Sequence, residues 1–444
     1  MMENRIADPE VRGATDANAP GGTRAKANQL LALALALLAT ALSGRLLLIS
    51  YQSAAEPAHG FVSHYAASRL LLEGVRVPVF YDDARMVQEV QRFEPGVTDM
   101  FGANPPTMAF AALPVAWMDY PTARLTWTLL SAVAWLVAVF WLCRACHLPA
   151  IWTAGAVAIA AVFQPALEHM RHGQFHVLVL VLVLIAWRFL KRRPRRAGAC
   201  LAIASVVKTG ALLLWPMLVV RRRWRAIDSG VITTLLILLA TIPFAGLSAW
   251  ALFFYKATDL VQGGSFSVTA YQTVHSLVRR LTVVDSQWNP APAFPFEYGA
   301  IAATVLAGVI LVIALILIDR RRDHDLAFAG FSALSLALLP QSLDYHYVLA
   351  MFPIVVLLSR LHDRPKSISF VLLGLATFVI AAALPHNSPR LANGAIAILA
   401  YPKLYGALIL AGLCLFIPAS ATNEDEVSAP STPAMSAGTS ASSV

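Results

Sequence analysis

The sequence predicts an all-α polytopic membrane protein with about 11–13 transmembrane helices, each able to cross a hydrocarbon core of ~30 Å. Of the 444 residues, 58% are hydrophobic and 13% are charged, and the mean hydropathy is +0.64. A soluble domain carries roughly 25% charged residues, so this chain has too few charges to cover a compact surface in water. Its apolar runs, such as 177–185 and 305–318, lack the alternation of barrel strands and therefore predict helices.

The membrane-embedded domain is expected to extend from residue 28 to residue 418. Residues 1–27 and 419–444 are polar and rich in small residues, a composition that predicts disordered cytoplasmic tails. The first span is interpreted as an uncleaved anchor, because apolar residues resume after Arg45. The expected spans are 29–50, 121–146, 150–168, 174–190, 228–244, 298–318, 326–340, 345–360, 368–384 and 395–418.

Two further apolar segments are not expected to cross the membrane once. Segment 106–118 is bounded by prolines and, at 1.5 Å per residue, is too short for a ~30 Å core, so it is either re-entrant or lies along the surface. Segment 197–220 has basic clusters at both ends. If both ends are cytoplasmic, it must enter and return as two short half-helices that turn near Lys208-Thr209-Gly210.

Charge predicts the orientation of the spans. The formal net charge is +9, and the cations cluster at 191–196, 221–225 and 320–322, directly beside apolar runs. Such clusters follow the positive-inside rule more often than they bind nucleic acid, so no nucleic-acid partner is expected. With 106–118 not crossing, every strong basic cluster falls on the cytoplasmic side. The loops 51–105 and 245–297 are then extracytoplasmic.

This orientation collects polar side chains at one membrane surface. The candidates there are Glu56, His59, His64, Tyr81, Asp82, Asn104, Gln174, His275, Asp344 and His346. Such a pocket suits a lipid-linked substrate with an anionic headgroup. Lys208 joins this set because a lysine within a span costs at least about 2.5–3.5 kcal/mol. The alternative is that it reaches the interface or pairs with a carboxylate.

Neither a metal nor a cofactor is expected. His169, His172 and His176 have helical spacing that suits a metal site, but Gly173 interrupts the helix and no cysteine is near. The stretch 143–147 fits the C-x-x-C-H pattern of haem attachment, but it is expected at the cytoplasmic end of a helix, whereas haem attachment requires the oxidising side.

Several sequence blocks, in order, resemble glycosyltransferase family 87, a family of polyprenyl-phosphate-sugar-dependent membrane transferases in the GT-C superfamily. Residues 61–70, followed by Glu73-Gly74 and Tyr81-Asp82, resemble the family's "DFxxxxAAxxLxxG…YD" stretch. The other matching blocks are Asn104-Pro105-Pro106, Gly173-Gln174, Ala197-Gly198, Lys208, Arg223-Trp224-Arg225-Ala226, 271–280, and His346 with Pro353.

The resemblance implies a GT-C-like helical bundle in the plasma (inner) membrane of a bacterium. It also implies inverting transfer of a hexose, often mannose, from a polyprenyl-phosphate-linked donor to a lipid or glycan acceptor, on the extracytoplasmic side. The partners are then the donor, the acceptor and the lipid bilayer. Lys208 and His346 would contact the leaving phosphate.

The sequence departs from the family at one important position. The family's acidic residue, its presumed general base, corresponds here to Gly60, and a glycine cannot deprotonate an acceptor hydroxyl. Asp82 and Glu56 are the expected catalytic substitutes, with His59 adjacent. Two alternatives remain open at this point: a carrier or flippase for a lipid-linked glycan, and a catalytically silent relative that only binds such a lipid.

Overall fold

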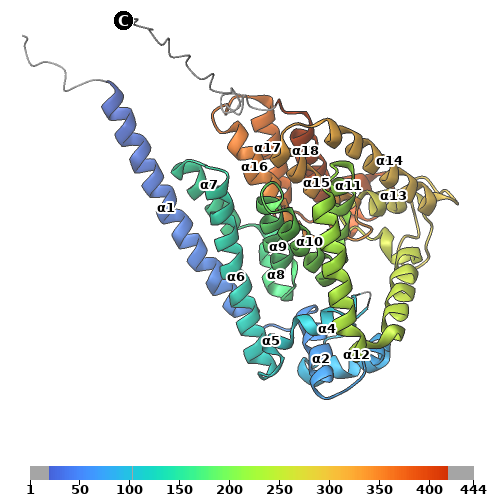
Figure 1. Ribbon diagram of the computed structural model, residues 1–444. Helices are drawn as coiled ribbons and strands as arrows, with labels where there is room; N and C mark the ends of the chain where they lie inside the picture. The colour runs from blue at the N-terminus through green and yellow to red at the C-terminus, as the bar shows by residue number, and fades with distance from the viewer. Residues whose placement is uncertain (1–19, 103, 419–444) are drawn as a thin grey trace, which may run out of the picture.

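The computed structural model describes residues 20–102 and 104–418, which fold almost entirely as helices (Figure 1). Within these ranges no β-strand forms apart from one isolated bridge, between Asp285 and Asn289. The all-helical prediction is therefore confirmed. Of the two expected tails, only residues 20–27 are described, and they begin α1 (Pro20–Ser53); the remainder, 1–19 and 419–444, lies outside the described residues.

Long apolar helices give the described part of the chain a membrane-protein architecture. Five segments are long and apolar enough to cross a bilayer: Gln29–Ser53 of α1, α6 (Tyr120–Ala145), Trp224–Asp259 of α12, α14 (Gly299–Arg320), and Asp344–Leu361, which joins η4 (Asp344–Ala350) to α16 (Met351–Leu361). Two bent pairs raise this number to seven if each is one span: α7 (Ala150–Ala161) with α8 (Gln164–His172), and η6 (Gly394–Ala400) with α18 (Pro402–Phe416).

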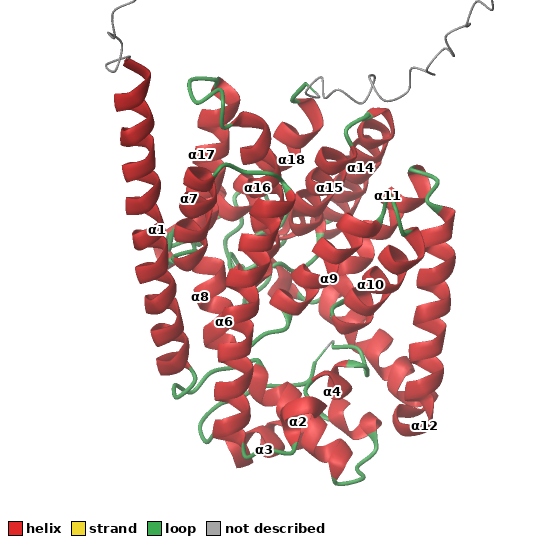
Figure 2. Ribbon diagram, turned by 60° about the vertical axis from the view of Figure 1, so that its left-hand side comes forward, coloured by secondary structure: helices red, strands yellow, loops and turns green. Residues whose placement is uncertain are grey.

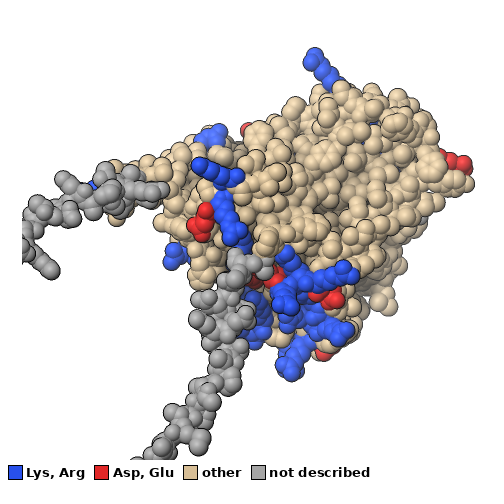
Figure 3. Space-filling view, turned by 90° about the horizontal axis from the view of Figure 1, so that it is seen from above, with Lys and Arg blue, Asp and Glu red and all other residues tan. Residues whose placement is uncertain are grey.

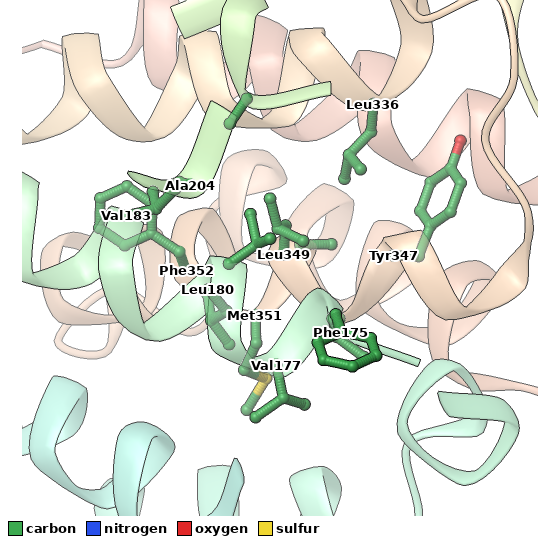
Figure 4. Close-up of a cluster of buried hydrophobic side chains, with 14 of the residues drawn as sticks. Phe175, Val177, Leu180, Val183, Ala204, Leu336, Tyr347, Leu349, Met351 and Phe352 are labelled. Atoms are coloured by element: carbon green, nitrogen blue, oxygen red, sulfur yellow. The ribbon is translucent and has the colours of Figure 1, made fainter. Parts of the chain in front are cut away.

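The remaining expected spans are shorter apolar helices. They are α9 (His176–Phe189), α15 (His324–Leu338) and α17 (Ile368–Ala381), of 14, 15 and 14 residues. The buried side chains of α9 and α15 meet those of α10, η4 and α16 in the interior of the bundle (Figure 4). Residues in this cluster include Val177, Leu180, Val183, Ala204, Leu336, Leu349, Met351 and Phe352.

The predicted break at Lys208 is confirmed. The helix α10 (Pro194–Val207) ends there, Lys208 itself is extended with φ −140° and ψ 116°, and η2 (Thr209–Leu214) and α11 (Trp215–Val220) follow. Gly198 lets α10 pack directly on α12, because a Cβ at residue 198 would collide with the carbonyl oxygen of Ala226.

A layer of short helices covers one end of the bundle (Figure 2). It contains α2 (Phe61–Leu72), η1 (Val77–Tyr81), α3 (Asp83–Phe93), α4 (Met108–Ala111) and α5 (Leu113–Ala116). The last two helices have four residues each, so segment 106–118 cannot cross a membrane, as expected. We call this group the α2–α5 layer.

The segment 245–297, expected as a loop, contains helices. The element α12 (Trp224–Gln262) consists of two helical stretches joined by a kink at Gly246, whose φ of 74° and ψ of 159° are not helical and which lies three residues after Pro243. A proline inside a helix leaves one carbonyl without its backbone partner and bends the helix. The rest of the segment contains η3 (Gly264–Ser267) and α13 (Val274–Thr282), and η5 (Pro389–Leu391) precedes η6.

Basic side chains gather at the opposite end of the bundle from the α2–α5 layer. Figure 3 shows Lys and Arg on this face, seen from above the view of Figure 1. Arg193, Arg195 and Arg196 line one hollow together with Arg225, so two of the predicted basic clusters meet in space. This arrangement agrees with the charge pattern, while the assignment of the face to the cytoplasm stays a prediction.

Candidate active site

A cavity of about 680 Å³ lies between the α2–α5 layer and the helical bundle. One wall comes from the start of α2, from residues 98–102 and from Asn104, and the opposite wall comes from the Lys208 break, α12, α15 and η4. The predicted site residues that line it are His59, His64, Asn104, Gln174, Lys208 and His346. The fold thus brings together six of the eleven side chains selected from the sequence.

The side chain of Lys208 crosses from the bundle to the segment that precedes α4. Its Nζ donates a hydrogen bond of 2.9 Å to Asn104 Oδ1. Asn104 is held in turn, because its Nδ2 donates to Phe101 O at 2.6 Å and its carbonyl accepts from Tyr81 Oη at 2.9 Å. No ion pair among the described residues involves Lys208. The cavity wall therefore carries a cation that is oriented by an amide and not neutralised by a salt bridge.

Aromatic rings form the wall around His346. Its Nδ1 accepts a hydrogen bond of 3.0 Å from the backbone N–H of Leu343, which orients the ring. The ring of His176 lies 4.0 Å from that of His346, and Tyr345 lies 4.8 Å from His346 and 5.3 Å from His176. These contacts hold three polar rings at one edge of the cavity.

His64 and Gln174 lie deeper in the wall. The ring of His64 packs edge-on against Phe175 at 5.2 Å, and burial, with the charge of Lys208 as a second cause, holds its pKa well below the usual range. Gln174 is 6% exposed, and its Oε1 has no hydrogen-bond partner within the described residues. An unpaired buried acceptor of this kind is available to a ligand hydroxyl.

The two carboxylates predicted as substitutes for the general base do not line the cavity. Asp82 is exposed and caps α3, where its Oδ1 accepts from the backbone N–H of Arg85 at 3.2 Å. Glu56 is also exposed, and its carbonyl oxygen accepts a bond of 3.1 Å from Arg124 Nη2. Their positions therefore give no support to the catalytic role expected for them.

Three other predicted residues lie behind the cavity wall or away from it. The Tyr81 hydroxyl supports Asn104 by donating a hydrogen bond to its carbonyl oxygen. Asp344 forms a buried ion pair with Lys403 at 2.9 Å, at the start of the segment that carries His346. His275 lies on α13 with its Nε2 3.4 Å from Thr304 Oγ1 of α14.

The structure adds one carboxylate to the cavity, that of Asp99. It is the only Asp or Glu among the described residues that line the cavity. Its Oδ2 accepts a hydrogen bond of 2.7 Å from the backbone N–H of Gly60, and its Oδ1 one of 2.9 Å from that of Met100. The only signal in the sequence is the position of Asp99 between two glycines with positive φ, Gly96 and Gly102.

Gly60 itself cannot hold a side chain in this fold. Its φ of 107° lies where side-chain-bearing residues are rare, and a Cβ would lie 2.5 Å from both Gln174 Nε2 and His172 O. The backbone at residue 60 is therefore packed against the end of α8 and the connection between α8 and α9. An acid at position 60 would require this contact to open.

The three histidines with helical spacing have separate partners. His169 Nε2 accepts from the backbone N–H of Val177 at 3.1 Å. His172 Nε2 lies 3.4 Å from Glu168 Oε2, and its Nδ1 donates to His59 O at 3.1 Å. His176 packs on His346. In the described part of the chain, no group of three His, Cys, Asp or Glu side chains is placed to hold a metal ion.

The sequence matches a known family over most of the cavity-forming region. The model of glycosyltransferase family 87 matches residues 103–342, more than half of the 444 residues. The chain belongs to glycosyltransferase family 87. It is accordingly a membrane glycosyltransferase, as the resemblance of its sequence blocks implied.

One curated relative is similar over a longer stretch than this match. It is the polyprenol-phosphate-mannose-dependent alpha-(1-2)-phosphatidylinositol mannoside mannosyltransferase of Mycobacterium tuberculosis. The two proteins are 23% identical over 301 residues, which cover 63% of this chain and 67% of the relative.

The family 87 match covers only part of the cavity. Asn104, Gln174 and Lys208 lie inside the matched segment 103–342, whereas Asp99, Gly60 and His346 lie outside it. This family 87 protein thus builds its cavity from the matched segment and from flanking residues on both sides.

Proposed function

We propose that this family 87 protein transfers a hexosyl group, specifically mannosyl, from a polyprenyl-phosphate-linked donor to a hydroxyl of a lipid or glycan acceptor, with inversion at the anomeric carbon. The observation that carries the proposal is the Lys208 side chain, held by Asn104 at 2.9 Å in the wall of the cavity. In this reaction the leaving group departs as a phosphate that gains negative charge. A positioned cation stabilises that charge more strongly in a water-poor cavity than in water.

His346 is proposed to contact the same phosphate. Its Nδ1 is engaged by the N–H of Leu343, so the remaining ring nitrogen, Nε2, carries the proton and can donate to a phosphate oxygen. Lys208 and His346 line the same cavity from different elements. Two donors on one phosphate would both strengthen as the glycosidic bond breaks, which is the requirement for accelerating the reaction.

The identity of the donor is supported by the relative. The name of the mycobacterial protein specifies polyprenol-phosphate-mannose as its donor and a phosphatidylinositol mannoside as its acceptor. The extracytoplasmic location is supported by the positive-inside rule, because the cavity lies at the opposite end of the bundle from the face rich in Lys and Arg (Figure 3). We therefore place the reaction at the non-cytoplasmic surface of the plasma membrane.

The test uses purified protein in proteoliposomes that contain polyprenyl-phospho-[14C]mannose and membrane lipid. Wild-type protein is expected to form a labelled lipid or glycan product. Lys208→Met removes the cation and should lower the rate by about 10²–10³-fold, the loss seen when one group that stabilises developing charge is removed. Lys366→Met is the matched control, because Lys366 is exposed and lies in the loop before α17, outside the cavity.

Two outcomes would contradict the proposal. Movement of the labelled lipid between leaflets without a transfer product would identify a carrier. Full transfer activity in the Lys208→Met protein would show that the cavity cation has no part in the reaction.

A further inference from the structure

We propose that Asp99 is the general base that deprotonates the acceptor hydroxyl. This inference rests on the proposed function, and it gives the protein a base at a position other than residue 60, a glycine that cannot accept a proton. Asp99 lies later in the same segment, 51–105, and its carboxylate contacts the backbone of Gly60, 39 positions earlier in the sequence.

The composition of the cavity wall supports this assignment. Among the described residues that line the cavity, Asp99 alone carries a carboxylate. Asp82 and Glu56 are exposed and outside the lining. His64 lines the cavity, but its lowered pKa makes it a weak proton acceptor near neutral pH. His172 has Nδ1 bonded to His59 O and Nε2 directed to Glu168.

The carboxylate of Asp99 is held in a fixed orientation and still has free acceptor sites. Each of its oxygens accepts one backbone N–H, from Gly60 at 2.7 Å and from Met100 at 2.9 Å. An ionised carboxylate has about four lone-pair sites, so half of them remain for a ligand. Two backbone bonds reduce the motion of the side chain, which favours a proton transfer that depends on precise placement.

Asp99 and Lys208 act within one electrostatic environment. Both side chains line the same cavity. The two charged side chains nevertheless have different anchors, since Asp99 is bonded to Gly60 and Lys208 to Asn104. A base and a cation that share a cavity but do not form a salt bridge can act on different parts of one reaction.

The reaction step balances with these two residues. The acceptor oxygen forms a bond to the anomeric carbon while its proton moves to the Asp99 carboxylate. The bond between the anomeric carbon and the phosphate oxygen breaks, and its electron pair stays on that oxygen, where Lys208 stabilises the charge. The products are the inverted glycoside, polyprenyl phosphate and a protonated Asp99, which returns its proton to water.

Gly60 and Asp99 act as a unit in this arrangement. Position 60 has no room for a side chain, and its N–H is the group that orients Asp99. The glycine that departs from the family pattern is thus a positioning residue for the carboxylate that replaces the missing acid.

The test compares three acid-to-amide variants: Asp99→Asn, Asp82→Asn and Glu56→Gln. Each is assayed for transfer from polyprenyl-phospho-[14C]mannose and for binding of polyprenyl phosphate, and the rate is divided by the fraction of protein that binds. This division removes any loss caused by misfolding. Asp99→Asn is expected to bind polyprenyl phosphate and to lose about 10²–10⁴-fold in transfer, the usual contribution of a general base. The other two variants should retain transfer.

Two results would overturn the inference while leaving the proposed function intact. One is wild-type transfer rates in the Asp99→Asn protein, and the other is loss of transfer in Asp82→Asn or Glu56→Gln instead. If wild-type protein transfers no label at all, the proposed function fails first and the inference fails with it.

Discussion

Lys403, whose side chain is 1% exposed, lies with its Nζ 2.9 Å from Asp344 Oδ2. The same carboxylate lies 3.3 Å from His386 Nε2. Asp344 directly precedes Tyr345 and His346, which line the cavity. The ion pair therefore ties the start of η4 to the start of α18 and holds one wall of the cavity in place.

Removing this lysine is expected to destabilise the protein. Lys403→Met removes one of the two cationic partners of the Asp344 carboxylate, which is 20% exposed and keeps His386 at 3.3 Å, so the cost is expected to stay below the ~3–5 kcal/mol of breaking a fully buried ion pair from one side. Thermal unfolding of the detergent-solubilised protein should show a clearly lower midpoint than for the exposed control Lys366→Met. An unchanged midpoint for Lys403→Met would mean that the pair does not anchor η4.

Gly60→Ala is expected to reduce both stability and activity. The new methyl group would meet Gln174 Nε2 and His172 O at 2.5 Å, and φ is 107°, so the backbone must move and the bond to Asp99 with it. Gly74→Ala is the control that adds backbone strain without a steric clash, because Gly74 has φ 77° but no atom within 4 Å of the added Cβ. Strain at such a position costs about 1–2 kcal/mol. Only Gly60→Ala should also lose transfer activity, and equal losses in both variants would exclude the proposed coupling.

Close packing between α10 and α12 leads to a third prediction. Gly198→Ala places a methyl group against the carbonyl oxygen of Ala226, and overpacking of this kind costs about 1–3 kcal/mol. Gly155→Ala in α7 has nothing within 4 Å and should stabilise its helix by up to about 1 kcal/mol. The unfolding midpoints of the two variants should therefore shift in opposite directions. A shift in the same direction would contradict the packing described for Gly198.

His275 is expected to make the stability of the folded protein depend on pH. Burial, and then the charge of Arg279, lowers its pKa to about 4, whereas an unfolded histidine titrates near 6.5. Below that value the unfolded chain binds a proton that the folded protein excludes, so stability falls as the pH decreases from about 6.5 toward 4. As the pH decreases over this range, the unfolding midpoint of the His275→Gln protein should fall less than that of the wild type. An identical slope for both proteins would show that His275 titrates normally.

Energetic cost and charge made the Lys208 break predictable from the sequence. Lysine inside an apolar stretch and basic clusters at both ends leave few arrangements for 197–220, and the extended backbone at Lys208 is one of them. The order of the sequence blocks likewise placed Asn104, Gln174 and His346 at one site. These residues belong to segments whose ends are fixed by long helices, so their proximity follows from the spans.

Asp99 was not predicted because its role depends on a distant contact. The segment 51–105 contains several acidic residues in similar polar surroundings, and apart from the flanking Gly96 and Gly102 nothing local distinguishes Asp99 from Asp82. The difference arises only when the Gly96–Gly102 turn folds back on Gly60. The helical stretch of α12 beyond Gly246 was missed for a related reason: Pro243 and Gly246 normally end a helix, and the helix is interrupted at Gly246, but a second helical stretch follows it to Gln262.

The part of α12 beyond its kink is a single helix that lies between the cavity and the outer surface of the protein. Phe253 and Ala257 face the cavity, while Phe254 and Tyr255 on the other side are 62% and 68% exposed. Withdrawing a long isoprenoid tail from the membrane would cost about 0.8 kcal/mol for every methylene-sized group transferred to water. If the donor's headgroup enters the cavity beside this helix, its tail can stay dissolved in the surrounding acyl chains. The length of the tail should then have little influence on how tightly the donor is bound.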